Sequence, residues 1–181
     1  MTGAQVDLPK LVGLLARRGL TLATAESLTG GQLAADLVAV PGVSAVFRGG
    51  VVAYQNEVKA ALLGVSERLL QERGSVDAGV AGQMALGACS ATGARIGLAT
   101  TGAAGPDPHD GKPVGTVFVA VAFDGVLEVA EHYFDGGRAQ IRRLAEKSAL
   151  ALLAAVLAAD TGSTASQDSL GKQPGTKQID G

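Results

Sequence analysis

The chain has 181 residues, of which 47% are hydrophobic and 18% charged, which favours one packed domain over a disordered chain. The formal net charge of −2 gives no bulk attraction to nucleic acid, so we expect no direct nucleic-acid partner. The single cysteine, Cys89, excludes an intrachain disulfide, and two distant histidines without a Cys/His cluster argue against a structural zinc site.

The segments that would target a protein to a membrane or for export have no clear counterpart here. The N-terminus lacks a basic stretch followed by an uninterrupted apolar run. Charged residues also interrupt the apolar segments throughout the chain. We therefore expect a cytoplasmic protein with no membrane partner.

The first half of the chain alternates between helical and strand patterns. Leucines and valines from Leu8 repeat at helical spacing until Arg17. Within the second strand, Gly49-Gly50 indicates a bulge or a close backbone approach. In the last helix of this half, glycines among the apolar positions indicate close packing against a neighbour. After the first helix, the predicted elements are a strand at 20–25, a helix at 30–40, a strand at 46–54, short helices at 57–63 and 66–72, and a helix at 77–92.

The second half is richer in strands. A strand at 95–101 precedes a glycine- and proline-rich loop at 102–113. Strands at 114–123 and 126–134 are joined by Asp124-Gly125, which is a strong hairpin signal. A helix at 138–159 follows. This order indicates an α/β layered domain with a mixed sheet.

The composition changes after Ala159. Residues 160–181 contain no aromatic side chain and few apolar ones, so they cannot bury enough surface to offset their ordering entropy. We interpret 1–159 as one domain and 160–181 as a flexible tail. A partner that folds this tail on binding is the alternative.

Ser27 lies in the segment AESLTGG (25–31), where a strand ends and a helix begins. It could be a nucleophile beside unpaired backbone N–H groups, or it could cap the helix. Thr29 is an equally good cap, so Ser27 is less needed for capping. Gly30 and Gly31 would let a substrate approach the backbone.

Lys59 is the natural general base for Ser27, because serine–lysine pairs are a known variant of nucleophilic catalysis. It would have to be desolvated or placed beside another cation to lose its proton at neutral pH. The alternative is an ordinary surface lysine. Tyr54, at the end of the same strand, could bind substrate or relay a proton, or could be a half-buried strand aromatic.

Several polar groups could hold a substrate. The loop from Thr101 to Pro106 offers backbone donors suited to phosphate or carboxamide oxygen, although it is neither a Walker A sequence nor a dinucleotide fingerprint. Arg138, Arg142 and Arg143 begin the last helix and could bind phosphate or form a solvated basic face. Glu26 could orient a lysine or a ribose hydroxyl, or pair with a surface cation.

Four ordered motifs together resemble the CinA C-terminal domain family, also known as the nicotinamide-nucleotide amidohydrolase PncC. They are AESLTGG, VVAYQNEVKAALLGV, TTGAAGPD followed by KPVGTVFVAV, and FDGGRAQIRR. The resemblance as a whole runs from about Leu8 to Leu157. The resemblance implies a three-layer α/β/α domain with a mixed β-sheet. It also implies deamidation of nicotinamide mononucleotide to nicotinic acid mononucleotide and ammonia.

The resemblance carries over onto individual residues. It implies that Ser27, Lys59 and Tyr54 are catalytic and that the glycine loop maps onto 102–105. This chain has Leu28 where the family usually has Cys, and Gln55 where Ser is common. After Asp107 it continues with Pro108-His109 instead of Gly-Gly, which puts substrate contacts of this loop in question.

The resulting hypothesis is a serine–lysine amidohydrolase that needs neither a metal nor a cofactor. Backbone N–H groups of 28–31 would hold the oxyanion. We expect nicotinamide mononucleotide as substrate and a homo-oligomer as the assembly. The alternative is a non-catalytic nucleotide-binding or partner-recruiting module linked to competence or DNA damage. The expected substrate-binding residues are Glu26, Thr29, Gly30, Gly31, Thr101, Gly102, Ala104, Gly105 and Arg142.

Overall fold

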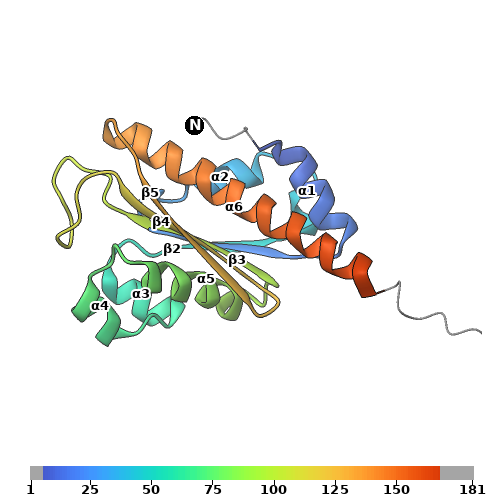
Figure 1. The fold of residues 1–181 in the computed structure, drawn as a ribbon, viewed down its shortest axis with the longest axis horizontal. Helices are drawn as coiled ribbons and strands as arrows, with labels where there is room; N and C mark the ends of the chain where they lie inside the picture. The colour runs from blue at the N-terminus through green and yellow to red at the C-terminus, as the bar shows by residue number, and fades with distance from the viewer. Residues whose placement is uncertain (1–5, 168–181) are drawn as a thin grey trace, which may run out of the picture.

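A central sheet of five strands lies between two layers of helices (Figure 1). The computed structural model describes residues 6–167, with side chains for residues 6–160. The strand order is β2-β1-β3-β4-β5. Strands β1, β2 and β3 are parallel, whereas β4 and β5 are antiparallel to their neighbours, so the predicted mixed sheet in a three-layer domain is confirmed. The strands are β1 Leu22–Glu26, β2 Phe47–Val52, β3 Ile96–Gly102, β4 Thr116–Phe123 and β5 Val126–Tyr133.

Gly49 and Gly50 of β2 lie at an irregularity of the sheet, as the sequence predicts. The register between β1 and β2 shifts by one residue near Gly49. A Cβ on Gly50 would lie 2.3 Å from Thr24 Oγ1, so only glycine allows this close approach. The predicted bulge and close contact are therefore both confirmed.

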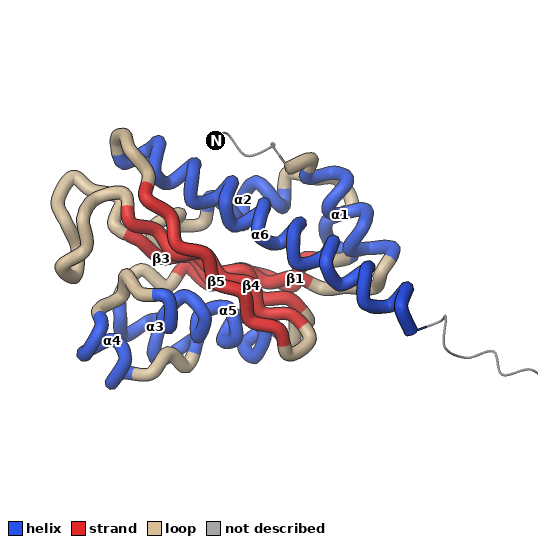
Figure 2. The backbone as a smooth tube through the Cα atoms, viewed as in Figure 1, coloured by secondary structure: helices blue, strands red, loops and turns tan. Residues whose placement is uncertain are grey.

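Helices cover both faces of the sheet, as Figure 2 shows in blue against the red strands. Helices α1, α2 and α6 lie on one face, and α3, α4 and α5 lie on the other (Figure 1). The bounds are α1 Leu8–Arg17, α2 Gln32–Val38, α3 Asn56–Leu63, α4 Glu67–Arg73, α5 Ala78–Thr92 and α6 Arg138–Gln167.

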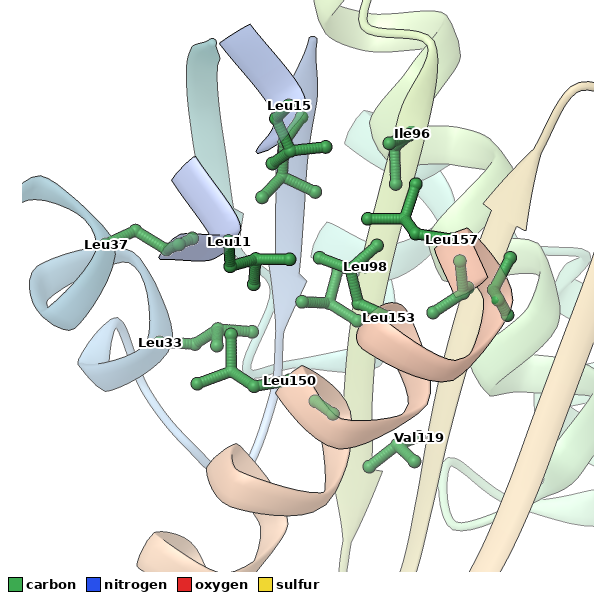
Figure 3. Close-up of a cluster of buried hydrophobic side chains, with 14 of the residues drawn as sticks. Leu11, Leu15, Leu33, Leu37, Ile96, Leu98, Val119, Leu150, Leu153 and Leu157 are labelled. Carbon is green, nitrogen blue, oxygen red and sulfur yellow. The ribbon is translucent and has the colours of Figure 1, made fainter. Parts of the chain in front are cut away.

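The two hydrophobic cores lie above and below the sheet. Figure 3 shows the first, where Leu11 of α1, Leu33 of α2 and Leu153 of α6 meet Leu98 of β3. The second core is built mainly from alanines and valines of α5 and the sheet. Such small side chains let α5 lie very close to its neighbours: a Cβ on Gly87 would lie 2.1 Å from the Leu63 carbonyl oxygen. The predicted close packing of the glycine-containing helix is confirmed.

One additional element and one helix end differ from the sequence prediction. A short 3-10 helix, Val43–Ala45, was not foreseen. Helix α6 continues to Gln167, although the predicted helix ended at Ala159. Adding residues to an existing helix requires no new nucleus, so a polar sequence can extend a helix that tertiary packing has already formed. The rest of the predicted tail, 168–181, lies outside the described residues.

Among residues 6–167, no helix combines the length and the apolar character that crossing a bilayer requires.

The connections between strands indicate where in the fold a site can lie. Strand β1 connects to β2 on one side, whereas β3 connects to β4 on the other. In α/β sheets, the carboxyl ends of two such strands commonly flank a ligand crevice.

Candidate functional site

A cavity of about 310 Å³ lies at the carboxyl ends of β1 and β3. The turn after β1 contributes Ser27, the segment after β2 contributes Tyr54, and the loop after β3 contributes Gly102. A larger hollow of about 640 Å³ between α3 and α4 contains none of the predicted catalytic residues. The smaller cavity is therefore the candidate site, because it gathers three of the predicted sequence segments.

Ser27 is held at the rim of this cavity by its backbone. Its N–H donates to Thr100 O at 2.9 Å, and its carbonyl accepts from Gly30 N–H at 3.1 Å. The residue is 8% exposed. Helix α2 has Gly31 as its N-cap, with φ of +94° and no side-chain cap. Ser27 and Thr29 therefore do not cap the helix, which removes the structural alternative for Ser27.

Glu26 accepts the hydrogen bonds of the backbone N–H groups at the start of α2. Its carboxylate accepts hydrogen bonds from the backbone N–H groups of Gly31 at 2.9 Å, Leu33 at 3.1 Å and Ala34 at 2.9 Å. The side chain is buried and does not line the cavity. The expectation that Glu26 binds substrate is corrected: it anchors helix α2 to the end of β1.

Thr29, Gly30, Gly31 and Arg142 are also expected substrate contacts, but the Thr29 hydroxyl, the two glycine N–H groups and the Arg142 guanidinium all have partners within the protein. The Thr29 hydroxyl is 2.7 Å from the Thr100 hydroxyl, and Gly31 donates to Glu26. The Arg142 guanidinium donates to Leu28 O at 2.8 Å and to Thr29 O at 2.6 Å. None of these four lines the cavity. Arg142 fixes the turn after Ser27 from outside, which corrects its predicted role as a phosphate ligand.

Lys59 lies behind the cavity wall and is completely buried, at 0% exposure. Its ammonium donates one hydrogen bond, to the carbonyl oxygen of Tyr54 at 3.2 Å. Burial lowers its pKa to about 8, because desolvation penalises the charged form more than Asp110 and Glu57 favour it. The alternative of a surface lysine is therefore wrong.

Tyr54 links the buried lysine to the cavity. Its carbonyl binds Lys59, while its side chain, 54% exposed, lines the cavity with Ser27. Within residues 6–160, no hydrogen bond directly joins Lys59 Nζ to Ser27 Oγ. The structure thus places Lys59, Tyr54 and Ser27 around one wall of the cavity, with no direct hydrogen bond between Lys59 and Ser27.

The loop after β3 forms the opposite wall, as the glycine-rich sequence predicts. Gly102, Ala104 and Gly105 line the cavity. A Cβ on Gly102 would lie 2.6 Å from Thr116 O, so its lack of a side chain allows β3 and β4 to stay paired there. Thr101 is buried beneath the cavity, where its hydroxyl donates to Ser75 O at 2.7 Å. Its predicted contact with substrate is corrected to a structural one.

Arg138 lines the cavity in the place expected for Arg142. Its guanidinium donates to Gly105 O at 2.7 Å and to the Tyr54 hydroxyl at 2.8 Å, and so joins the two walls. The sequence identified a group of arginines at the start of α6, but the choice among them depends on which helical face meets the cavity.

Ser75 and Asp110 also line the cavity, and the sequence analysis missed both. Asp110 accepts hydrogen bonds from the Ser75 hydroxyl at 2.8 Å and from the Ser75 backbone N–H. The two residues come from different loops, so no local pattern could have paired them. The departure after Asp107 from the pattern that the resemblance implies was the one available signal.

The backbone donors expected for an oxyanion reduce to two. Gly30 N–H donates to Ser27 O, and Gly31 N–H donates to Glu26. Among the described residues, Leu28 N–H and Thr29 N–H have no acceptor within the protein. These two N–H groups directly follow Ser27 and are the ones available to a bound oxygen.

The described residues contain no group of three or more His, Cys, Asp and Glu side chains that could hold a metal ion.

Known proteins are similar to this chain over most of its length. A family model described as the CinA C-terminal domain matches residues 8–157. A CinA-like protein of Frankia casuarinae is 49% identical over 148 residues, which is 82% of this chain and 34% of the relative. A CinA-like protein of Desulfotalea psychrophila is 44% identical over 147 residues, covering 81% of this chain and 36% of the relative. The chain thus spans about a third of the length of the curated relatives it matches.

Solved structures show the same fold. A competence-damaged protein (CinA) superfamily protein from Escherichia coli matches with a TM-score of 0.79 and 35% identity, over 81% of this chain and 86% of the other. A competence/damage inducible protein from Agrobacterium tumefaciens matches with a TM-score of 0.76 and 38% identity, over 86% of this chain and 98% of the other.

Proposed function

Because the chain belongs to the CinA C-terminal domain family, we propose that it is an amidohydrolase that deamidates nicotinamide mononucleotide to nicotinic acid mononucleotide and ammonia. One observation carries the proposal: the fully buried Lys59, whose pKa burial lowers to about 8, lies behind a cavity lined by Ser27. A lysine with this pKa is neutral in roughly a tenth of molecules at pH 7, which is enough for a general base.

In the proposed reaction, Ser27 Oγ attacks the carboxamide carbon while neutral Lys59 accepts the hydroxyl proton. The N–H groups of Leu28 and Thr29 hold the oxyanion, a contribution of about 3–4 kcal/mol each in comparable sites. Protonated Lys59 then gives its proton to the leaving ammonia. Water releases nicotinic acid mononucleotide from Ser27. The direct contact between Lys59 and Ser27 forms with substrate in place, as catalytic hydrogen bonds often tighten only then.

Arg138 is the cation that we assign to the nucleotide phosphate. Arg138 lines the cavity and is exposed, whereas Arg142 does not line the cavity and is partly buried against the carbonyls of Leu28 and Thr29. Tyr54 supports the site from two directions, since its carbonyl binds Lys59 and its hydroxyl binds Arg138. A change at Arg138 is therefore expected to raise KM more than it lowers kcat.

The test is ammonia release from nicotinamide mononucleotide by the parent, Ser27→Ala and Lys59→Met. We expect either change to lower kcat/KM by roughly 10³-fold or more, with folding retained, because each removes a group needed for proton transfer or attack. Ser90→Ala and Lys147→Met, at exposed helix positions, are the matched controls. Unchanged turnover in folded Ser27→Ala contradicts the mechanism, and an inactive, well-folded parent contradicts the proposed activity.

A further inference from the structure

The backbone carbonyl of Leu28, in the turn after Ser27, is held by a side chain from the last helix. Arg142 Nε donates to Leu28 O at 2.8 Å, and Arg142 Nη2 donates to Thr29 O at 2.6 Å. Among the described residues, no other group donates to Leu28 O, whereas Thr29 O also accepts from the Gln32 N–H at 3.2 Å. The position of the Leu28 carbonyl therefore depends on Arg142.

Holding this carbonyl also fixes the direction of a backbone donor. The C=O of Leu28 and the N–H of Thr29 belong to the same planar trans peptide group, in which the two bonds point in opposite directions. The Thr29 N–H therefore points away from the Arg142 guanidinium. Leu28 lines the cavity and Arg142 does not, which agrees with an N–H that faces the cavity and a carbonyl that faces away from it.

The neighbouring free donor, the Leu28 N–H, is oriented by a different bond. It shares a peptide group with the Ser27 carbonyl, which accepts from the Gly30 N–H at 3.1 Å. That bond lies within the turn and needs no side chain from elsewhere in the fold. Of the two free N–H groups after Ser27, the one that depends on a distant side chain is therefore that of Thr29.

Arg142 acts on this peptide group through its charge as well as its position. Hydrogen bonds from a charged donor are stronger than neutral ones, and linked hydrogen bonds polarise one another. The bond from Arg142 draws electron density toward the Leu28 oxygen and so makes the Thr29 N–H a stronger donor. Arg142 is partly buried, which reduces the screening of its charge by water.

Helix α6 gives Arg142 a rigid support. Ile141 and Ala145, which flank it on the helix, are completely buried in the first core. A Cβ added to Gly30 would lie 3.4 Å from Arg142 Nη2, so the guanidinium packs directly against the turn. The core thus fixes the helix, and the helix fixes the guanidinium against the turn.

We propose that Arg142 is a positioning residue that orients the Thr29 N–H toward the oxyanion and strengthens it as a donor. Negative charge on the oxygen is larger in the transition state than in the bound substrate, so this role affects kcat and leaves KM nearly unchanged. The consequence for catalysis rests on the proposed function, whereas the effect on the Thr29 N–H requires no substrate.

The kinetic experiment compares the parent with Arg142→Met and Arg142→Lys on nicotinamide mononucleotide. Methionine keeps an unbranched side chain but donates no hydrogen bond, and lysine keeps the charge but lacks the fork that reaches two carbonyls. We expect kcat to fall by roughly 10- to 100-fold in Arg142→Met, with KM within about threefold of the parent, and to fall less in Arg142→Lys. A purely stabilising role for Arg142 would lower the free energy of unfolding but not the kcat of the folded protein.

The matched control is Arg143→Met. Arg143 is the next residue of α6, is exposed, and makes no hydrogen bond among the described residues. Its kcat and KM should equal those of the parent. An unchanged kcat in folded Arg142→Met, or an equal fall in Arg143→Met, overturns the proposal.

Backbone NMR observes the peptide group directly and without substrate. The carbonyl carbon of Leu28 and the amide nitrogen of Thr29 both respond to a hydrogen bond at the carbonyl that they share. We expect both signals to move upfield in Arg142→Met and to stay in place in Arg143→Met. Unchanged signals in Arg142→Met contradict the proposal.

The two experiments separate failure of this inference from failure of the proposed function. If the parent releases no ammonia from nicotinamide mononucleotide, the proposed function fails, and the NMR signals still decide whether Arg142 holds the Thr29 N–H. Should Arg142→Met fail to fold, Arg142→Lys must show a smaller movement of the same signals in the same direction. Parent-like signals in Arg142→Lys would then overturn the proposal.

Discussion

Glu26 and Lys59 are both almost completely buried, yet they differ in the number of their hydrogen-bond partners. Three backbone N–H groups surround the Glu26 carboxylate, whereas the Lys59 ammonium has a single carbonyl partner. A buried charge is tolerated when it is fully hydrogen-bonded, and otherwise its pKa moves toward the neutral form. Glu26 therefore has a structural role, and the incompletely paired Lys59 is the one suited to proton transfer.

Glu26→Ala tests this distinction. It leaves three N–H groups at the start of α2 without their acceptor, so we expect the free energy of unfolding to fall by roughly 2–4 kcal/mol. Urea denaturation measures the change, and Glu128→Ala, at an exposed strand position, should stay within about 0.5 kcal/mol of the parent. Full stability with a raised KM would instead restore Glu26 as a substrate contact.

At the scale of elements, helix α5 packs closely because it is built from small residues. Gly87 lies directly over the end of α3, and a side chain there would meet the Leu63 backbone. Gly13 of α1 is also a helical glycine, but an added Cβ would meet only the flexible end of Arg17, at 3.3 Å. Glycine is therefore required by the packing at position 87 but not at position 13.

Substituting alanine at these two glycines should give effects of opposite sign. Gly13→Ala gains helix propensity and should stabilise the protein by up to about 1 kcal/mol. Gly87→Ala forces α3 and α5 apart and should destabilise it by roughly 2 kcal/mol or more. Thermal unfolding of both variants measures this, and a loss of stability below 1 kcal/mol for Gly87→Ala would show that α3 can shift freely.

A second contact between elements joins α2 to α6. Glu146 is buried there, and it accepts from Gln32 Nε2 at 2.7 Å. Burial, together with the neighbouring Asp36, raises the pKa of Glu146 to about 7. Native Glu146 therefore keeps a proton between pH 4.5 and 7 that the unfolded chain releases, so its contribution to stability is present below pH 4.5 and is lost as pH rises through 7.

Glu146→Gln imitates the protonated form at every pH. Its amide can donate to Asp36 while its oxygen still accepts from Gln32. At pH 8 we expect the variant to be more stable than the parent by on the order of 2 kcal/mol, with the difference disappearing near pH 4.5. Chemical denaturation at the two pH values measures it, and a difference independent of pH would rule out the titration as its cause.

At the scale of the whole molecule, the site lies where the sheet changes its direction of connection. Strands β1 and β3 leave toward opposite sides, and the loops that follow them open around one cavity. The helices on both faces bury the end of this region, which is why Lys59 of α3 can be shielded from water so close to a cavity. The architecture, more than any single contact, supplies the low-polarity surroundings that Lys59 requires.

The pH dependence of the free energy of unfolding should reflect the burial of Lys59. Between pH 8 and 10.5, native Lys59 has released a proton that the unfolded chain still holds, so the free energy of unfolding rises with pH over this window. The rise amounts to roughly 3 kcal/mol. Lys59→Met lacks it, and the difference between parent and variant, measured by urea denaturation from pH 6.5 to 10.5, cancels the other titrating groups. A constant difference would mean that Lys59 is not desolvated.

The sequence by itself determined the five strands, the main helices and several of the residues around the site. Hydrophobic periodicity and turn residues act over short distances along the chain, so they predicted all five strands within a few residues. The same local patterns put Ser27 and Tyr54 at strand ends and Lys59 just beyond, and parallel strands then bring those ends to one edge of the sheet.

Only the tertiary structure decided which charged groups face the cavity and which hold the fold together. Glu26 binds the start of α2, Arg138 replaces Arg142 at the cavity, and Asp110 meets Ser75 from a distant loop. Each of these assignments depends on which side of an element faces inward and on contacts between segments far apart in the chain. The physical reason is that burial and charge interactions are set by distances in space, which a local pattern of residues does not encode.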